Sequence, residues 1–258
     1  MNPKEISECG VVLLGGTAGV GLETAAQFAE QGARVVLLGR NPERGGAACK
    51  VVRDRVPGAD VGFVQVDAMD LADTVRAEQA ARDRLGAIDV LVCSTGPSHP
   101  PVILRDIPIE EVKPRLDYIL VPPLNMMCAI LPAMRRQKGG AIINVASIAA
   151  KVATPGETAI GAAMAAITMF SQTAALEEKR NFIRINVLTP SLIANTPGAA
   201  LFTTDSYSVK MWEKVASKAH LGVPEPEDIA MMTIFLAGPA ARRITGQAIS
   251  INGGISVG

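Results

Sequence analysis

The sequence predicts a doubly wound α/β fold, with a parallel sheet of about seven strands and helices on both of its faces. Short apolar runs alternate with longer stretches of helical spacing from one end of the chain to the other. The runs are rich in β-branched residues, which is typical of parallel strands that are buried on both faces. A chain of 258 residues is long enough for one such unit, so we expect a single domain over residues 1–258.

The first half of the chain contains four strand-like runs, each followed by a helix-like stretch. After the first run, apolar residues recur at Leu22, Ala25, Ala26 and Ala29, which is the spacing of one helix face. The later pairs repeat this change from a continuous apolar run to a striped segment. In order, we expect a strand at Gly10–Leu14, a helix at Gly19–Gln31, a strand at Arg34–Leu38, a helix around Arg44–Arg53, a strand at Val61–Val66, a helix around Leu71–Leu85, a strand at Ile88–Cys93 and a long helix over much of Ile109–Gln137.

The second half continues the alternation, with two irregularities. Pro122 and Pro123 lie inside the longest expected helix and must interrupt or kink it, because proline has no N–H to donate. Residues Pro197–Val223 break the alternation, and they predict a lid or substrate loop, because they are polar but include Phe202, Tyr207 and Trp212. The other expected elements are a strand at Ala141–Val145, a helix at Thr158–Lys179, a strand at Ile183–Leu188, a helix at Pro226–Leu236 and a strand at Ala248–Ile251.

Charge and cysteine content exclude several classes of protein. The 25 basic and 25 acidic side chains balance, so no basic face indicates nucleic-acid binding. The four cysteines show no CxxC spacing, and we expect buried free thiols in a reducing cytosol rather than disulfides or a zinc site. The polar N-terminus does not resemble a signal peptide, and Pro, Gly or charge breaks every long apolar run, so we expect a cytoplasmic protein with no membrane span.

A glycine-rich turn follows the first strand and precedes the first helix. Gly15, Gly19 and Gly21 allow a sharp turn and a close approach of a pyrophosphate, which the helix N-terminus then binds through its free N–H groups. The strand before the turn and the helix after it favour a dinucleotide site over a βα turn that binds nothing. Arg40, at the end of the second strand, either pairs with a ribose 2′-phosphate, which favours NADP(H) over NAD(H), or is an ordinary surface residue.

With these motifs the chain resembles the short-chain dehydrogenase/reductase family over essentially its whole length. The family pattern Thr-Gly-x-x-x-Gly-x-Gly fits Leu14–Gly21, with Leu14 in place of the Thr. The pattern after strand four fits Cys93–Gly96 with only the Gly kept, and the Asp that holds adenine fits Asp67. The patterns near the C-terminus fit Ile183–Ser191, Thr245–Gln247 and Asn252–Gly254. The resemblance implies a cofactor site formed by Gly15, Thr17, Gly19, Val20, Gly21, Arg40, Asp67, Ala68 and Gly96.

The catalytic positions of the family are mostly apolar in this chain. The resemblance implies a Ser, a Tyr with a Lys four residues later, and an Asn one helix earlier. Ser147 fits the Ser, whereas Ile160, Met164 and Ile119 occupy the Tyr, Lys and Asn positions. An apolar pocket does not donate a proton or stabilise an alkoxide. The loss of the Lys, together with the replacements at Leu14, Cys93 and Ser191, predicts weak or lost cofactor binding.

Other polar residues lie near the expected site, and each of them alone is also explained by a solvated surface role. His99 follows Gly96 in a loop at the carboxyl edge of the sheet, and its ordinary pKa suits proton transfer. Tyr118 adjoins the lost Asn position, and Glu157 precedes the helix that carries Ile160. Tyr207 and His220 lie in or near the expected lid. His99 and Tyr207 are the candidates for relocated catalysis.

Three functions remain open at this point. The first expectation is a non-catalytic subunit that supports an active paralogue in a hetero-oligomer, as the inactive subunits of some hetero-oligomeric dehydrogenases of the family do. A homotetramer is the alternative assembly. The second is an NADP(H)-dependent oxidoreductase with relocated acid–base residues. The third is a non-redox enzyme, such as a hydratase, cyclase or hydrolase, on the same fold. No nucleic acid, membrane or metal is expected as a partner.

Overall fold

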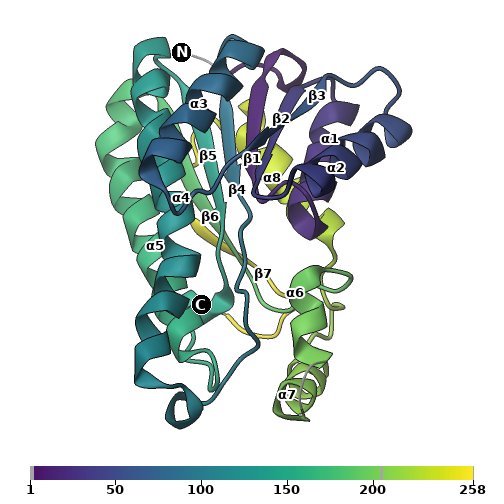
Figure 1. Cartoon of the computed structure of the whole chain (residues 1–258), viewed down its shortest axis with the longest axis vertical. Helices are drawn as coiled ribbons and strands as arrows, with labels where there is room; N and C mark the ends of the chain where they lie inside the picture. Colours follow the sequence, from purple (N-terminus) through teal and green to yellow (C-terminus); the bar gives the residue numbers. More distant parts are fainter. Residues whose placement is uncertain (1–2, 204–205, 258) are drawn as a thin grey trace.

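The computed structural model describes residues 3–203 and 206–257, with a seven-stranded parallel sheet at its centre (Figure 1). The strand order is β3-β2-β1-β4-β5-β6-β7. The order reverses between β1 and β4, and the carboxyl ends of strands at such a reversal form the crevice in which doubly wound folds bind ligands. The strands are β1 (Gly10–Leu14), β2 (Arg34–Gly39), β3 (Val61–Gln65), β4 (Val90–Cys93), β5 (Gly140–Val145), β6 (Ile183–Pro190) and β7 (Ala248–Ile251).

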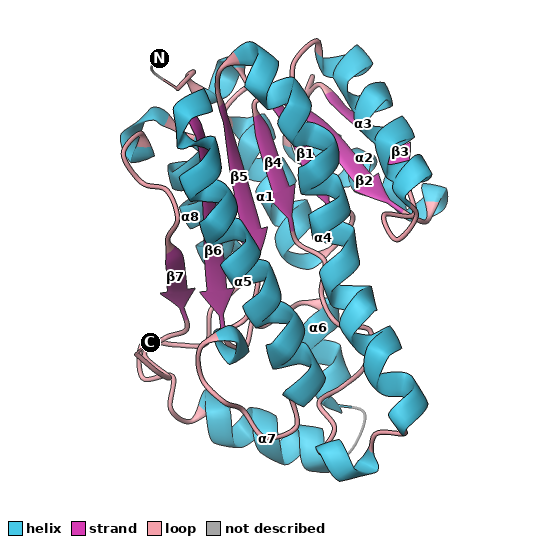
Figure 2. Ribbon diagram, turned by 90° about the vertical axis from the view of Figure 1, so that its left-hand side faces the viewer, coloured by secondary structure: helices cyan, strands magenta, loops and turns pink. Residues whose placement is uncertain are grey.

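Helices cover both faces of the sheet (Figures 1 and 2). One face is covered by α1 (Gly19–Glu30), α2 (Pro42–Arg55) and α8 (Pro226–Ala237), and the other by α3 (Leu71–Leu85), α4 (Ile109–Gln137) and α5 (Thr158–Glu178). Two short helices, α6 (Pro197–Ala200) and α7 (Ser206–Ala216), lie beyond the carboxyl ends of the strands, in the segment expected to form a lid. The predicted fold class is therefore confirmed, and the strands and helices of the sheet layers end within about two residues of their expected positions in most cases.

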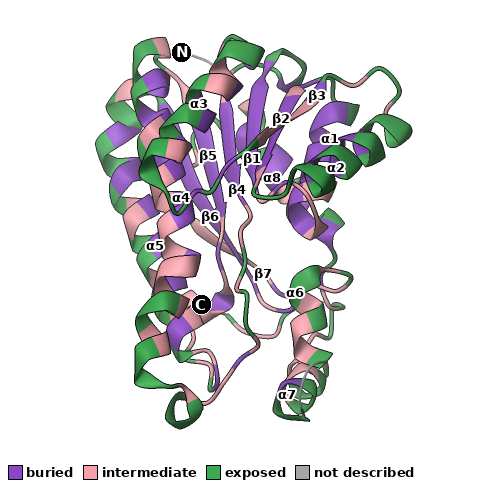
Figure 3. Cartoon of the chain, in the orientation of Figure 1, coloured by how far each residue is buried: buried purple, intermediate pink, exposed green. Residues whose placement is uncertain are grey.

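Alternate residues of the central strands point into two separate cores. Val11 and Leu13 of β1 face α1 and α8, whereas Val12 and Leu14 face α3 and α4. All four side chains are buried, as are nearly all residues of the central strands in Figure 3. Burial on both faces explains why the strands read as continuous apolar runs in the sequence.

The prolines of α4 do not interrupt it, so of the two expected outcomes at Pro122–Pro123, an interruption or a kink, the interruption is wrong. The helix runs from Ile109 to Gln137 with Pro114, Pro122, Pro123 and Pro132 inside it. A proline removes a hydrogen bond to the preceding turn but leaves the following turns intact. Pro122 and Pro123 are buried, and α4 packs against α3, α5 and the sheet, so tertiary contacts hold the helix together.

Two helices, Ile109–Gln137 and Thr158–Asn181, are long and apolar enough to cross a membrane by length and composition alone. Both are partly buried in this fold, where they pack against each other and against the sheet. Core helices pass the same test, so the criterion is weak evidence for a span. Cys9, Cys49 and Cys93 are buried free thiols as expected, but Cys128 on α4 is exposed, because it lies on the outer face of that helix.

A buried arginine at the start of β6 caps the end of α8. The guanidinium of Arg184 donates to the carbonyl oxygens of Ala237 at 2.7 Å and Ala241 at 3.1 Å, and also to that of Leu236. Carbonyls in the last turn of a helix have no partner within the helix and carry its negative dipole end. Arg184 therefore ties α8 to the sheet at the edge opposite the crevice.

Candidate functional site

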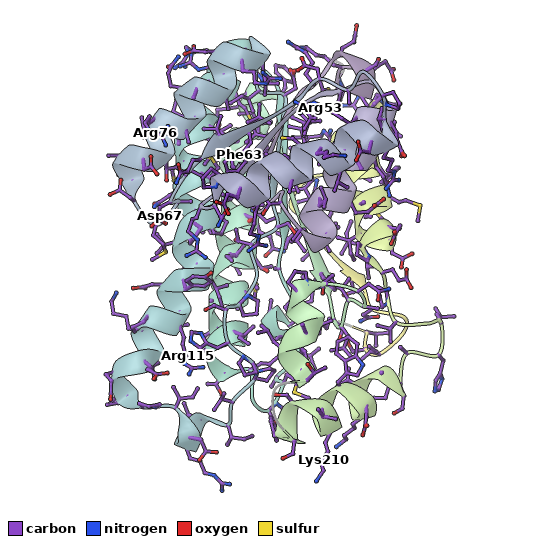
Figure 4. All side chains as sticks on the ribbon, turned by 45° about the vertical axis from the view of Figure 1, so that its right-hand side comes forward. Arg53, Phe63, Asp67, Arg76, Arg115 and Lys210 are labelled. Carbon is purple, nitrogen blue, oxygen red and sulfur yellow. The ribbon has the colours of Figure 1, made fainter. Side chains whose placement is uncertain are left out.

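A cavity of about 600 Å³ opens at the carboxyl ends of the strands, at the point where the strand order reverses. It extends from the glycine-rich turn and the end of β2 to the first residues of α5 and the lid. In Figure 4, Asp67 marks the level at which the strands end, and α7, which carries Lys210, lies farther down, across from the part of α4 that carries Arg115. The cavity is thus enclosed by the sheet edge, α4, α5 and the lid.

The glycine-rich turn leaves no room for side chains. A Cβ on Gly15, whose φ is +80°, would lie 2.6 Å from the carbonyl oxygen of Ser94, and a Cβ on Gly21 would lie 2.2 Å from that of Gly15. Ala18 precedes α1 and supplies no side-chain cap. The first N–H groups of α1 are therefore left for a ligand, and they are the donors that a pyrophosphate uses at a helix N-terminus.

The lid begins directly over this turn. A Cβ on Gly19, whose φ is +49°, would contact Pro197 and Thr196 at 3.2 and 3.3 Å. The hydroxyl of Thr196 accepts a hydrogen bond from the N–H of Ala199 at 3.0 Å and so caps α6. Beyond α6, the rings of Phe202 and Trp212 pack 5.3 Å apart and line the cavity.

Two arginines line the cavity near the end of β2, and no carboxylate of the described residues lines that part of it. Arg40 donates to the hydroxyl of Tyr118 at 2.7 Å, and its guanidinium lies 5.3 Å from the centre of the same ring. Arg44, from the first turn of α2, lines the same part of the cavity. Within residues 3–203 and 206–257, neither arginine forms a salt bridge. Tyr118, whose direction the sequence left open, faces the cavity.

The segment after β3 is held by hydrogen bonds that leave it open to the cavity. Asp67 accepts a hydrogen bond from the N–H of Met69 at 3.1 Å, and Asn125 on α4 donates to the carbonyl of Ala68 at 2.9 Å. Asp67, Ala68 and Met69 all line the cavity. The structure brings the expected cofactor residues together there: Gly15, Thr17, Gly19, Val20, Arg40, Asp67, Ala68 and Gly96 line the cavity, and Gly21 lies directly beneath the turn.

The three apolar replacements belong to one hydrophobic cluster. Ile119 and Met164 are buried, Ile160 is half-buried, and all three pack with Ala163 and Ile167. Met164 and Ile160 line the large cavity, whereas Ile119 lines a smaller hollow beside it. An unpaired polar side chain at any of these three positions would be costly, because its neighbours in the cluster are apolar.

Ser147 lies in the cavity at the start of a short 3₁₀ turn, Ile148–Ala150. Its Oγ accepts a hydrogen bond from the N–H of Ala149 at 3.2 Å. The hydroxyl proton is therefore left to donate to a ligand. The turn packs against the start of α5, where a Cβ on Gly161 would lie 3.0 Å from the carbonyl oxygen of Ala149.

Of the two candidates for relocated catalysis, only one lines the cavity. His99 lines it, but its side chain is exposed, and its Nδ1 lies 2.9 Å from the hydroxyl of Ser98. Tyr207 on α7 does not line the large cavity, and its hydroxyl donates to the carbonyl of Pro155 at 2.9 Å. His220 is exposed and lies outside the cavity.

Glu157 is the cavity residue that the sequence reasoning undervalued. It precedes α5, one helical turn before Ile160, and lines the cavity together with Ser147 and Ile160. Burial raises the pKa of its carboxyl from 4.5 to about 7. Its spacing of three residues from Ile160 was visible in the sequence, but its place in the cavity was not, because the cavity is formed by segments that are distant along the chain.

The chain matches the family model described as Enoyl-(Acyl carrier protein) reductase over residues 15–256. It is 33% identical to the 3-oxoacyl-[acyl-carrier-protein] reductase FabG of Chlamydia muridarum, over 99% of this chain and 100% of that protein. It is 31% identical to the 7alpha-hydroxysteroid dehydrogenase of Bacteroides fragilis, over 96% of this chain and 94% of that protein. Among solved structures, it is similar to the NADPH-bound short chain oxidoreductase of Pseudomonas aeruginosa PAO1 that contains an atypical catalytic center, with 26% identity, a TM-score of 0.88 and coverage of 99% of this chain and 100% of that one.

These similarities contradict the expectation of a non-catalytic subunit. The relatives are named as reductases and dehydrogenases, and they match nearly the whole chain. The expectation treated the loss of three polar side chains as the loss of acid–base chemistry. The cavity nevertheless holds other polar groups, among them Ser147, Glu157 and His99.

Proposed function

The chain belongs to the short-chain dehydrogenase/reductase family, and on that premise we propose that it is an NADP(H)-dependent oxidoreductase with acid–base groups other than the family's Tyr and Lys. The observation that carries the proposal is the cavity, which joins a cradle for a pyrophosphate at one end to Ser147 at the other. The atypical catalytic center of the similar Pseudomonas oxidoreductase supports it.

The residues of the cavity fit a dinucleotide. The N–H groups at the start of α1 would bind the pyrophosphate, and Arg40 and Arg44 would pair with a ribose 2′-phosphate. The missing Lys, replaced by buried Met164, removes one charged contact and favours modest affinity. When bound, the reduced cofactor supplies a hydride to a carbonyl carbon. Ser147 donates a hydrogen bond to the carbonyl oxygen and orients it.

The substrate end of the cavity favours an apolar carbonyl compound or the corresponding secondary alcohol. Ile160, Leu192, Phe202 and Trp212 line it, and Ser147 and Glu157 are the polar groups between them. The relatives act, by their names, on substrates as different as a 3-oxoacyl thioester and a steroid. The lid rather than the sheet therefore determines which carbonyl compound fits, because it supplies the two aromatic rings.

We expect the purified protein to oxidise NADPH in the presence of apolar ketones, and we expect Arg40→Asp to reverse its cofactor preference. Calorimetry should give a dissociation constant for NADPH of roughly tens of micromolar and weaker binding of NADH. Removing a charge-assisted contact costs about 1.5–3 kcal/mol, so Arg40→Asp should weaken NADPH binding roughly 10- to 100-fold and spare NADH.

Arg242 is the matched control, because it is exposed and lies at the opposite edge of the sheet. Arg242→Asp should bind both cofactors as the unmodified chain does. Binding of neither cofactor, combined with no turnover of any ketone in the panel, would show that the proposed function is wrong.

We also propose that α5 forms a subunit interface with a second copy of this chain. Its outer face exposes Ala162, Ala166, Met169 and Leu176, of which Met169 is 63% and Leu176 64% exposed. Small residues let another helix approach closely, and Met side chains fill the remaining gaps. The hetero-oligomer was expected only because a non-catalytic role was expected. For an enzyme, we therefore propose the homo-oligomer.

Ala166→Glu is expected to split the oligomer or to precipitate it, because it places a charge at the centre of this apolar face. Glu43→Lys, on the exposed surface of α2, is the control and should leave the assembly unchanged. Sedimentation velocity at micromolar concentration measures both. A stable monomer of the unmodified chain under these conditions would disprove the interface.

A further inference from the structure

We propose that Glu157 is the proton donor for carbonyl reduction in this protein, and the proton acceptor in the reverse reaction, in place of the absent phenol. The proposal rests on the oxidoreductase function proposed above, and it names the acid–base residue that this function requires. It is carried by the position of Glu157 at the start of α5, by its half-buried place in the cavity and by the contacts that fix the turn on which it lies.

Glu157 is the N-cap of α5, three residues before Ile160, which takes the position of the family's Tyr. Its carbonyl oxygen accepts the first hydrogen bond of α5, from the N–H of Gly161 at 2.6 Å. Residues three apart on a helix are neighbours, with Cβ atoms about 5–6 Å apart, and helical side chains lean toward the N-terminus. The side chain of Glu157 is longer than that of Ile160, and both side chains line the cavity.

Ser147 and Glu157 are held in a fixed relation. The 3₁₀ turn that Ser147 begins contacts α5 at Gly161, one residue after Ile160. Ser147 and Glu157 therefore line the cavity from two segments that touch each other. A carbonyl compound bound in this cavity is therefore exposed to both side chains.

The turn before α5 is clamped from two sides. The N–H of Val102, in the loop after β4, donates to the carbonyl of Gly156 at 2.7 Å. On the other side, the hydroxyl of Tyr207 in the lid donates to the carbonyl of Pro155 at 2.9 Å. The same hydroxyl oxygen would lie 2.7 Å from a Cβ on Gly156. Tyr207, a catalytic candidate from the sequence, therefore acts as a positioning residue for the turn that carries Glu157.

The surroundings of Glu157 keep its carboxyl available as an acid near neutral pH. Burial raises its pKa to about 7, and no charged neighbour is needed to account for the shift. Two titratable or charged groups line the cavity or the hollow beside it near the start of α5, His99 from the loop after β4 and Arg115 from α4. Tyr207 from α7 contacts the turn before Glu157, and Arg40, Arg44 and Asp67 line the cofactor end of the cavity. In the part of the chain that the structure describes, the carboxylate makes no ion pair.

The reaction balances with these groups. A bound NADPH would supply the hydride to the carbonyl carbon and would be the reductant. The carbonyl oxygen takes the proton of the Glu157 carboxyl, so the carboxyl O–H bond breaks as the alcohol O–H bond forms. The carboxylate that remains recovers a proton from water at the open side of the cavity. His99 fits this role less well, since its side chain is exposed and contacts Ser98.

Glu157→Gln tests the assignment with little change in size. We expect kcat for ketone reduction to fall roughly 10²- to 10⁴-fold, with an unchanged dissociation constant for NADPH. In the unmodified protein the reduction rate should fall as the pH rises through about 7, because the acid form is lost there. The residual rate of the variant should lack this inflection. Glu177→Gln, an exposed glutamate on the same helix, is the matched control.

A measurement without cofactor or substrate tests the same group independently. Difference infrared spectroscopy of the free protein should show the carbonyl stretch of a protonated carboxylic acid that titrates near pH 7 and is absent from Glu157→Gln. If the unmodified protein reduces ketones and Glu157→Gln keeps both the rate and the pH inflection, the assignment is wrong while the function stands; a loss confined to His99→Gln would then identify the donor. If the infrared band is present but no ketone is reduced, the oxidoreductase function is what fails.

Discussion

Gly21→Ala is expected to abolish dinucleotide binding. The added Cβ would lie 2.2 Å from the carbonyl oxygen of Gly15, a backbone atom that cannot rotate away. The turn and the first residues of α1 must then move apart, so the N–H groups at the start of α1 no longer converge on a pyrophosphate. Overpacking of this kind costs about 1–3 kcal/mol in stability as well. Calorimetric titration with NADPH measures the first effect, and thermal unfolding the second.

Gly46→Ala is the control for this substitution. Gly46 lies in α2, and a Cβ added there would meet nothing within 4 Å. Alanine is favoured over glycine inside a helix by about 0.5–1 kcal/mol, so this variant should bind NADPH normally and be slightly more stable. Normal binding by Gly21→Ala would mean that the turn does not hold the pyrophosphate.

The second large effect is expected at Arg184, where Arg184→Met should destabilise the fold by about 3 kcal/mol or more. Its guanidinium donates to the carbonyl oxygens of Ala237 and Ala241 and to that of Leu236, which are at the end of α8 and just after it. Methionine fills part of the space but leaves these carbonyls buried without a donor, and each such group costs about 1–3 kcal/mol. Urea denaturation followed by far-ultraviolet circular dichroism measures the change.

Arg180→Met serves as the comparison, since Arg180 is exposed and lies just before β6. Exposed substitutions of this kind change stability by no more than about 0.5 kcal/mol. Because Arg184 lies at the edge of the sheet opposite the cavity, NADPH binding by the folded fraction of Arg184→Met should be unchanged. Equal stability of the two variants would show that α8 is held by its apolar face alone.

The fold could be predicted from the sequence because its pattern is local. Strands such as Val11–Leu14 are apolar on both faces, and α1 shows its stripe within three turns, so length and periodicity determine the type of each element. The uninterrupted α4 could not be predicted, since the contacts that hold a helix through Pro122 and Pro123 come from distant elements. Tertiary packing overrides local propensity there.

The candidate site could be predicted in part for the same reason. The glycines of the turn and Arg40 follow their strands directly, so their positions in the crevice are consequences of topology. Glu157 differs, because the cavity that it lines is formed by several segments. The contacts that hold the two residues before it come from segments about fifty residues away on either side along the chain. The sequence shows which residues do not match the family pattern, whereas the fold shows which other polar groups line the same cavity.

The single tryptophan of the chain, Trp212, lies in the lid and packs against Phe202. Its emission therefore reports on the environment of the cavity mouth rather than on the sheet. A fluorescence change during denaturation marks the opening of the lid and need not coincide with the loss of circular dichroism from the core. The same property makes the unlabelled protein its own optical probe, because a ligand that enters beside Phe202 alters the surroundings of the only indole.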